Sequence, residues 1–300
     1  MGIVVVGSVA FDDVITPSGK NFNAPGGSAT FFSLSASYFT RVKLVAVCGR
    51  DFPEKYIRLF KKRNIDTDGL EIKNGLTFRW KGSYLNDLNA AQTIYTRLNL
   101  FKDFSPVLPH SYRNERVVFL ANINPGLQLD VLKQVKKPWI TAADTISLWI
   151  STERKKMLEV LKRIDIYIIN EHEARQLTGV DNLLKAATRI VSMGPRIVII
   201  KKGEHGLLAL ADKKVIAYPA YLVKDVLDPT GAGDTFAGGF LGYIAKAAKI
   251  DDKSIRQALV YGSVMASFNV EDFDIRGLVR LDGPAIEKRV DNFKRIFAVR

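Results

Sequence analysis

The feature that most constrains the fold is a series of short β-branched runs, each followed by a glycine-rich or polar turn. Strands that are apolar throughout are typical of a parallel sheet that is buried on both faces. Helix-like segments separate these runs, so the sequence predicts an α/β fold with a doubly wound, mostly parallel central sheet and helices on both faces. The predicted strands are 2–6, 43–48, 117–121, 139–143, 165–169 and 196–200, and the predicted helices include 31–39, 153–162, 235–248, 254–268 and 284–297.

Polar residues follow the ends of several predicted strands, and their positions predict a ligand site. In open α/β sheets a ligand binds outside the carboxyl ends of the parallel strands. Carboxylate and amide groups at that edge can accept hydrogen bonds from the hydroxyl groups of a ligand. An ordinary turn or a helix cap is the alternative for each of them. The residues are Asp12 after the first strand, Asn122 and Asp144 after the third and fourth, and Asn170 with Glu173 after the fifth.

The stretch Asp-Pro-Thr-Gly-Ala-Gly-Asp-Thr-Phe-Ala-Gly-Gly-Phe, residues 228–240, predicts a turn that leads directly into a helix. Proline cannot continue a sheet ladder, and Gly231 and Gly233 permit backbone angles that are closed to other residues. The residues from 235 to 248 tolerate a helix and are largely apolar, so residues 231–234 would form its first turn with unpaired N–H groups. Such a helix start binds anions.

Asp234 in this first turn has two interpretations. Aspartate is favoured as an N-cap, and the glycines would then serve close packing alone. The other interpretation is a general base beside a cradle for negative charge, which takes a proton from a hydroxyl group while the amides stabilise a phosphoryl group. A general base and an anion cradle side by side would form part of a kinase.

Neither common nucleotide fingerprint is present, because Gly-x-Gly-x-x-Gly would need glycine where the chain has Phe236, and no Gly-x-x-x-x-Gly-Lys-Ser/Thr occurs. Residues 228–240 instead resemble the C-terminal signature of the ribokinase, or PfkB, family of carbohydrate and nucleoside kinases, and further motifs extend the resemblance over about residues 3–270. It implies an ATP-dependent phosphotransferase that moves the γ-phosphate to a primary hydroxyl of a sugar or nucleoside. Asp234 would be the general base, and Gly231, Ala232 and Gly233 would form the anion hole.

The resemblance also implies a substrate side. Gly26 and Gly27 match the N-terminal substrate motif of the family, and Ser28 matches the variant that resembles nucleoside kinases. Many members carry asparagine where this chain has Phe31, which could stack on a base or wall off a smaller sugar. The match at Ser28 favours a nucleoside, whose identity stays open. The expected substrate-binding residues are Asp12, Gly26, Gly27, Ser28, Asn122 and Asp144.

The nucleotide side is implied by a second set of motifs. Asn170 and Glu173 match the Asn-x-x-Glu motif of the family, in which the acidic residue holds magnesium through water. The resemblance further implies that Asp228 orients the loop or influences a monovalent cation. The segment 270–277 lacks the glycine-alanine pattern common there. The expected ATP-binding residues are Asn170, Lys202, Gly203, Gly206, Thr230 and Asn269.

A small β-lid is expected to interrupt the single kinase domain of residues 1–300, with contributions from about 13–24 and 70–101. Residues 76–85 and 93–101 alternate apolar and polar with aromatic side chains, which is typical of two strands. In the resembled family such a lid excludes water from the reacting phosphate and often forms a homodimer contact.

The composition limits the partners and the location. The net charge of +13 would suit nucleic acid, a membrane surface or small anions, but the basic residues are scattered, so we expect neither nucleic acid nor a membrane as a partner. The single cysteine, Cys48, excludes an intramolecular disulfide, and the N-terminus lacks a signal peptide pattern, so we expect a cytoplasmic protein. A non-catalytic nucleotide or metabolite sensor on the same fold is the alternative function.

Overall fold

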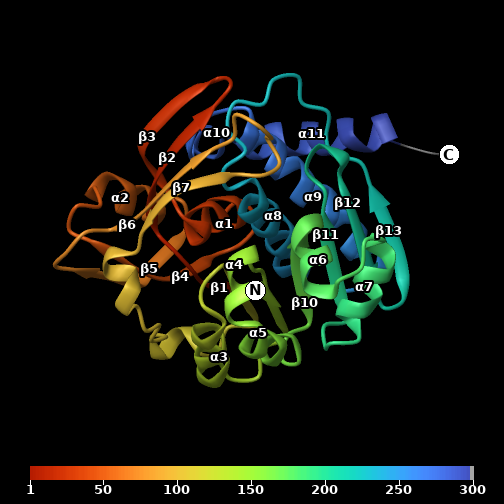
Figure 1. Ribbon diagram of the computed structural model, residues 1–300, viewed down its shortest axis with the longest axis horizontal. Helices are drawn as coiled ribbons and strands as arrows, with labels where there is room; N and C mark the ends of the chain where they lie inside the picture. Colours follow the sequence, from red (N-terminus) through yellow and green to blue (C-terminus); the bar gives the residue numbers. More distant parts are fainter. Residues whose placement is uncertain (298–300) are drawn as a thin grey trace.

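A nine-stranded sheet runs through the computed structural model, which describes residues 1–297 (Figure 1). Neighbouring strands are parallel from one edge of the sheet, at β5, across to β11. At the other edge β12 runs antiparallel to β11, and β13 runs antiparallel to β12. In spatial order the strands are β13 (Lys214–Tyr218), β12 (Leu207–Ala211), β11 (Ile197–Lys201), β10 (Ile166–Asn170), β9 (Ile140–Ala143), β8 (Val117–Leu120), β1 (Ile3–Val6), β4 (Val42–Gly49) and β5 (Ile65–Lys73).

Helices cover both faces of this sheet because alternate residues of each strand point to opposite sides. Ile3 and Val5 of β1 lie in one apolar cluster and Val4 and Val6 in the other, and none of the four is exposed. The predicted doubly wound fold is therefore confirmed. The first cluster includes side chains from α1 (Ser28–Ala36), α2 (Glu54–Lys62), α8 (Ala232–Ala247), α9 (Asp252–Val270), α10 (Arg276–Val279) and α11 (Gly283–Phe297), and the second from α3 (Pro125–Gln134), α4 (Ser147–Thr152), α5 (Arg154–Leu161), α6 (Glu171–Thr178) and α7 (Leu183–Val191).

Within residues 1–297, no helix is both long enough and apolar enough to cross a bilayer.

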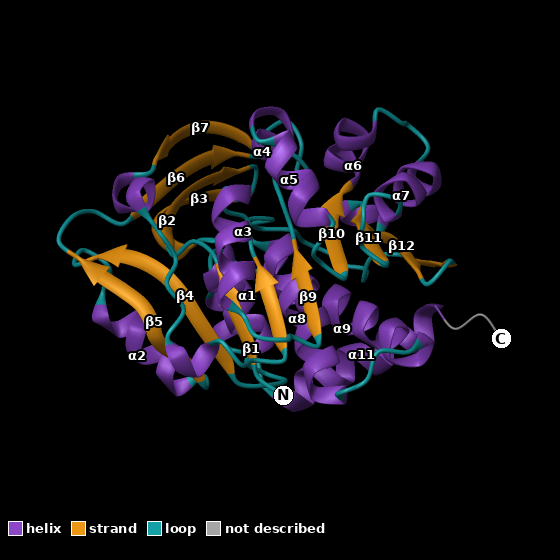
Figure 2. Ribbon diagram, turned by 90° about the horizontal axis from the view of Figure 1, so that it is seen from below, coloured by secondary structure: helices purple, strands orange, loops and turns teal. Residues whose placement is uncertain are grey.

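A second sheet of four strands lies on the side toward which the arrows of β1 and β9 point (Figure 2). Its order is β3 (Gly19–Gly26), β2 (Ala10–Thr16), β6 (Phe78–Ser83) and β7 (Gln92–Arg97). The pair β2 and β6 is parallel, whereas β2–β3 and β6–β7 are antiparallel hairpins. We call this small sheet and the turns that connect its strands the lid.

The lid differs at its edges from the range expected for it. Residues 70–73 belong to β5 of the large sheet, and Asn99–Asp103 form a 3-10 turn rather than the end of a strand. Strand β5 was not predicted because most of its residues are polar, in the sequence Ile-Asp-Thr-Asp-Gly-Leu-Glu-Ile-Lys. An edge strand pairs on one side only and tolerates such residues. The prediction of strands from apolar runs therefore failed at the edge.

Helix α8 packs closely against both α1 and α9, and its glycines make this approach possible. A Cβ placed on Gly238 would lie 2.5 Å from the carbonyl oxygen of Phe32 in α1. One placed on Gly239 would lie 2.9 Å from the carbonyl oxygen of Tyr261 in α9. The packing holds α8 against the sheet, with its N-terminus directed at the site described below.

We expect Gly238→Ala to lower the free energy of unfolding by about 1–3 kcal/mol, because overpacking against backbone outweighs the gain of about 0.5–1 kcal/mol that alanine brings to a helix. Gly283→Ala is the control, since no atom lies within 4 Å of its added Cβ. Urea unfolding of both variants checks this, and equal stability of the two would contradict it.

Candidate active site

The turn before α8 requires glycine at position 231 for two reasons. Gly231 has φ 73°, in the left-handed region, and a Cβ there would lie 2.3 Å from the ring of Phe31. The Ala232 amide donates to the Pro229 carbonyl at 3.2 Å, which tightens the turn. The following amides of the first helical turn have no intrahelical partner and can bind an anion.

Phe31, whose role the sequence left open, is only 2% exposed and packs beneath Gly231. Its ring therefore supports the turn from below and is not presented to a base or a sugar. The position at which the resemblance would place an asparagine thus holds an apolar side chain that packs in the protein interior.

Asp234 lies in the first turn of α8 and is partly buried. Burial raises the pKa of its carboxyl to about 6, and the ammonium of Lys201 opposes that rise. A carboxyl with this pKa is mostly ionised at neutral pH and can accept a proton from a hydroxyl group.

Lys201, the last residue of β11, was not identified from the sequence, which indicated its neighbour Lys202. A Cβ placed on Gly233 would lie 2.6 Å from the Lys201 Nζ, so the ammonium lies against the first turn of α8. Within residues 1–297, no carboxylate comes within 4.0 Å of this ammonium. Its charge nevertheless opposes the rise in pKa that burial causes in three carboxyl groups. These belong to Asp234, Asp144 and Glu173.

Asp12, in lid strand β2, lies within electrostatic range of Asp234. It is 6% exposed and accepts a hydrogen bond from the Gly27 amide at 3.3 Å. A Cβ on Gly26 would lie 1.9 Å from the Asp12 Oδ2, so this glycine lets the carboxylate lie against the backbone. Burial raises the pKa of Asp12 to about 7, and the charges of Asp228 and Asp234 add to the rise.

The hydroxyl group of Ser28 contacts Ser8. The Ser8 amide donates to its Oγ at 3.3 Å, and the two serine hydroxyls lie 3.2 Å apart. The Gly-Gly-Ser segment leads from β3 into α1, and Ser28 hydrogen-bonds the start of this helix to Ser8, which follows β1.

Tyr84 of the lid reaches this centre and was not identified from the sequence. Its ring is 8% exposed, and the Thr230 hydroxyl donates to its phenol oxygen at 3.4 Å. Burial raises the pKa of this phenol, as do the charges of Asp228, Asp12 and Asp234. The signal in the sequence that could have indicated Tyr84 was its position at the end of a lid strand whose residues alternate apolar and polar.

The turn between β6 and β7, which begins at Tyr84, also contacts the segment after β11. The Asn89 Oδ1 occupies the space above Gly203, because a Cβ there would lie 1.7 Å from that oxygen. The turn between β6 and β7 therefore spans the site, from Thr230 on one side to Gly203 on the other.

Asp144 and Glu173 form an acidic pair near Lys201. Asp144 follows β9, is 5% exposed, and its Oδ1 has no hydrogen-bond partner among the described residues. Burial raises its pKa well above the usual value, together with the charges of Asp234 and Glu173. Asp144, expected on the substrate side, thus lies in the electrostatic environment of Glu173 and Lys201.

Glu173 also caps a helix. Asn170 and Glu173 form a capping box at the start of α6, in which the Glu173 Oε2 accepts from the Asn170 amide at 3.0 Å and the Asn170 Oδ1 accepts from the Glu173 amide at 2.8 Å. The cap uses one carboxylate oxygen. Burial raises the pKa of Glu173.

This donor set fits magnesium. Residues 1–297 contain no group of three or more His, Cys, Asp or Glu side chains arranged to hold a metal by themselves. Magnesium commonly binds through one or two carboxylates, with waters and substrate phosphates as its remaining ligands. The orphaned Asp144 Oδ1 and the second oxygen of Glu173 could provide the protein's share.

The remaining expected residues lie around this centre. Asn269 is buried, donates to the Thr230 carbonyl at 2.8 Å and accepts from the Thr235 hydroxyl at 3.2 Å, so it positions the anion loop from within. The Asn122 Oδ1 accepts from the Trp149 indole at 3.0 Å. The others, Lys202, Gly203 and Gly206, form the turn between β11 and β12.

Three comparisons with known proteins show what this chain is similar to. A family model described as pfkB family carbohydrate kinase matches residues 3–277. The cytidine kinase of Thermococcus kodakarensis is 29% identical over 84% of this chain and 91% of its own length. The structure of Methanocaldococcus jannaschii nucleoside kinase has a TM-score of 0.74 at 20% identity, covering 97% of this chain and 98% of that one. Arabidopsis thaliana ribokinase, complexed with ribose and ATP, has a TM-score of 0.76 at 22% identity over 96% of this chain and 98% of that one.

We expect Asp12→Asn to stabilise the protein at pH 8 by about 1–4 kcal/mol. The folded pKa of Asp12, about 7, lies above its usual value of 3.8, so the folded state holds this proton more tightly than the unfolded state. The stability of the wild type should therefore decrease relative to the variant as the pH rises from about 4 to about 7. Urea unfolding of both proteins at pH 5 and pH 8 checks this. A stability difference that does not grow with pH would contradict it.

Proposed function

The chain belongs to the pfkB family of carbohydrate kinases, and we propose that it transfers the γ-phosphate of ATP to a primary hydroxyl of a nucleoside, with Asp234 as the general base. The observation that carries this proposal is the position of Asp234. Its carboxyl lies in the first turn of an anion-binding helix start, within electrostatic range of Asp12 and of the Lys201 ammonium that contacts Gly233.

Asp12 and the Gly26–Gly27 backbone would bind the hydroxyl groups of the sugar. The Asp12 carboxylate would accept hydrogen bonds from two hydroxyl groups and thereby orient the primary hydroxyl toward Asp234. Asp234 then removes the proton of that hydroxyl as its oxygen attacks phosphorus, and Tyr84 above it excludes water.

The first-turn amides from Gly231 to Gly233 and the Lys201 ammonium would stabilise the negative charge on the transferring phosphoryl group. Magnesium, when bound through water by Glu173 and Asp144, would neutralise charge on the nucleotide phosphates. Asn170, Lys202, Gly203, Gly206 and Thr230 would line the rest of the ATP site, and Asn269 would support it from behind.

A nucleoside is the acceptor we favour. A relative named cytidine kinase is similar over most of the chain, and Ser28 matches the variant found in nucleoside kinases. The lid also carries Trp80, a partly buried aromatic residue whose ring lies edge-on to that of the buried Tyr84, with 6.5 Å between the centroids. Aromatic rings of this kind can stack on a base.

We also propose that the lid forms a homodimer contact and that the enzyme works in the cytoplasm. Phe22 of β3 and Ile94 of β7 are 47% and 51% exposed, which gives the lid apolar side chains for a second copy to cover. Cys48 is a free, buried thiol, which is compatible with a reducing compartment.

The test of the function is ADP release with ATP and magnesium across adenosine, inosine, cytidine, ribose, fructose and fructose phosphates. We expect activity on a nucleoside, and we expect Asp234→Asn to lower kcat by about 10²–10⁴-fold with ADP affinity nearly unchanged, because a general base acts on the chemical step. An active Asp234→Asn protein would sink the base assignment. ATP binding without turnover of any acceptor would favour the sensor.

Lys201→Met should lower kcat by about 10²–10³-fold, because the ammonium faces the transferring group. Affinity for a non-hydrolysable ATP analogue should fall more than affinity for ADP, which lacks the γ-phosphate. Lys202→Met is the matched control and should show a smaller loss of kcat. Equal losses in the two variants would contradict the assignment of Lys201.

A further inference from the structure

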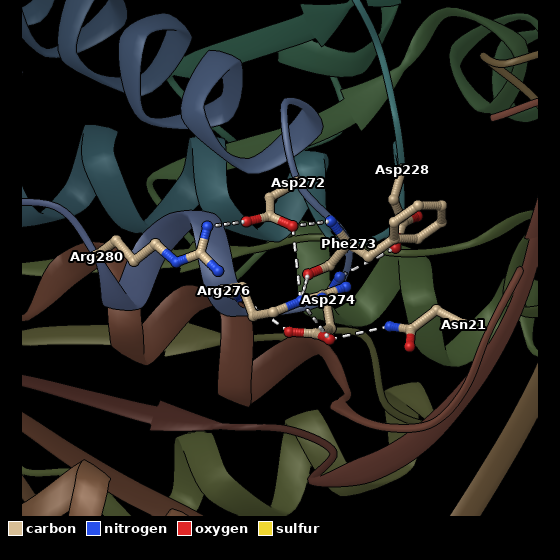
Figure 3. A network of polar contacts seen from close by, with 7 residues as sticks. All are labelled: Asn21, Asp228, Asp272, Phe273, Asp274, Arg276 and Arg280. Atoms are coloured by element: carbon tan, nitrogen blue, oxygen red, sulfur yellow. Dashed lines mark hydrogen bonds and ion pairs between the residues drawn. The ribbon is translucent and has the colours of Figure 1, made fainter. Parts of the chain in front are cut away.

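The segment between α9 and α10, residues 271–275, connects the anion loop to the lid (Figure 3). Asp228, only 1% exposed, accepts from the Thr230 amide through Oδ1 at 2.9 Å and from the Asp274 amide through Oδ2 at 3.2 Å. The carboxylate of Asp274 in turn accepts from the lid residue Asn21 at 2.9 Å. One residue of this segment therefore contacts both sides of the site.

A monovalent cation near Asp228, which the family resemblance implies, would need oxygen atoms directed toward it, as potassium is bound by carbonyl oxygens. The peptide that faces Asp228 from this segment presents its N–H, that of Asp274. The Val270 carbonyl already accepts from the amides of Leu227 at 2.7 Å and Asp228 at 3.3 Å, which matches its two lone pairs. The Phe273 carbonyl accepts from the Arg276 Nε at 3.1 Å. These oxygens therefore do not fit a cation shell.

The charges that hold the segment belong to the protein itself. The Arg276 Nε lies 3.2 Å from the Asp274 Oδ2 and 3.6 Å from the Asp272 Oδ1. The Arg276 amide also donates to the Asp274 Oδ1 at 2.9 Å. Arg280 pairs with the other oxygen of Asp272 at 2.9 Å. A guanidinium thus already neutralises the two carboxylates of this segment and occupies the Phe273 carbonyl, so that these oxygens are not free for another cation.

From these contacts we propose that the activity does not depend on a monovalent cation, because Arg276 and the Asp274 amide hold the segment 271–275 against Asp228. Arg276 is a positioning residue: it acts through Asp274 and Asp228 on the loop that begins at Thr230. This inference rests on the kinase function proposed above.

The first measurement is ADP release by the wild type with ATP, magnesium and cytidine in potassium, sodium or tetramethylammonium chloride at one ionic strength. We expect rates within threefold of one another. Activation by potassium of threefold or more over tetramethylammonium would overturn the proposal. No variant is needed, so a folding defect cannot obscure this result.

The second measurement compares Arg276→Met with Arg280→Met. We expect Arg276→Met to lose at least tenfold in kcat and to regain part of it with millimolar guanidinium, a recovery that a merely structural lesion would not show. The Arg280 side chain is 71% exposed, and within residues 1–297 its only polar partner is Asp272, so Arg280→Met should stay within threefold of the wild type. Full activity of Arg276→Met, or a loss that guanidinium leaves unchanged, would overturn the positioning role.

Calorimetric titration with ADP and magnesium in the same three salts separates this inference from the proposed function. If adenosine, inosine and cytidine are not phosphorylated in any salt, the acceptor proposal fails, and the ADP affinities still test the cation requirement. We expect dissociation constants within threefold across the salts, and a potassium-dependent increase in affinity beyond that would count against the inference.

Discussion

Several carboxylates are buried around the start of one helix, and their mutual repulsion is the constraint on which the site depends. Asp12, Asp144 and Asp234 come from the lid, from the end of β9 and from α8, and burial raises the pKa of each. Such groups can lie close together only where opposing charges and dipoles are fixed nearby. The Lys201 ammonium and the first-turn amides of α8 provide these, and the close packing of α8 on α1 and α9 fixes their direction. The site is thus kept at a cost in stability, as is common where function requires buried charge.

The lid completes this arrangement from the opposite side. Strand β2 carries Asp12, and the turn after β6 carries Tyr84 and Asn89 across the site as far as Gly203. Both substrates would therefore be enclosed by elements that contact one another, and closure would exclude water from the phosphate. The segment 271–275 adds a third support, because Asp274 links the lid to Asp228 through two of its polar groups.

Much of the fold could be predicted from local pattern. The buried β-branched runs of the parallel sheet were found because both of their faces are apolar, whereas the polar edge strand β5 was missed. The start of α8 was also predictable, since a glycine turn and an unpaired first helical turn are local properties of residues 228–240. Lys201 and Tyr84 were missed because their roles depend on neighbours distant in the chain, at Gly233 and Thr230.

The sequence by itself determined the doubly wound sheet, the anion-binding helix start and the presence of Asp234 in its first turn, because backbone angles and hydrogen-bonding capacity of a short segment decide these. Only the tertiary structure decided that Phe31 packs against the turn, that Lys201 contacts it, and that the segment after α9 presents the Asp274 amide to Asp228. Packing between distant elements decides which side chains share a space, and the electrostatic effect of each depends on which others lie beside it.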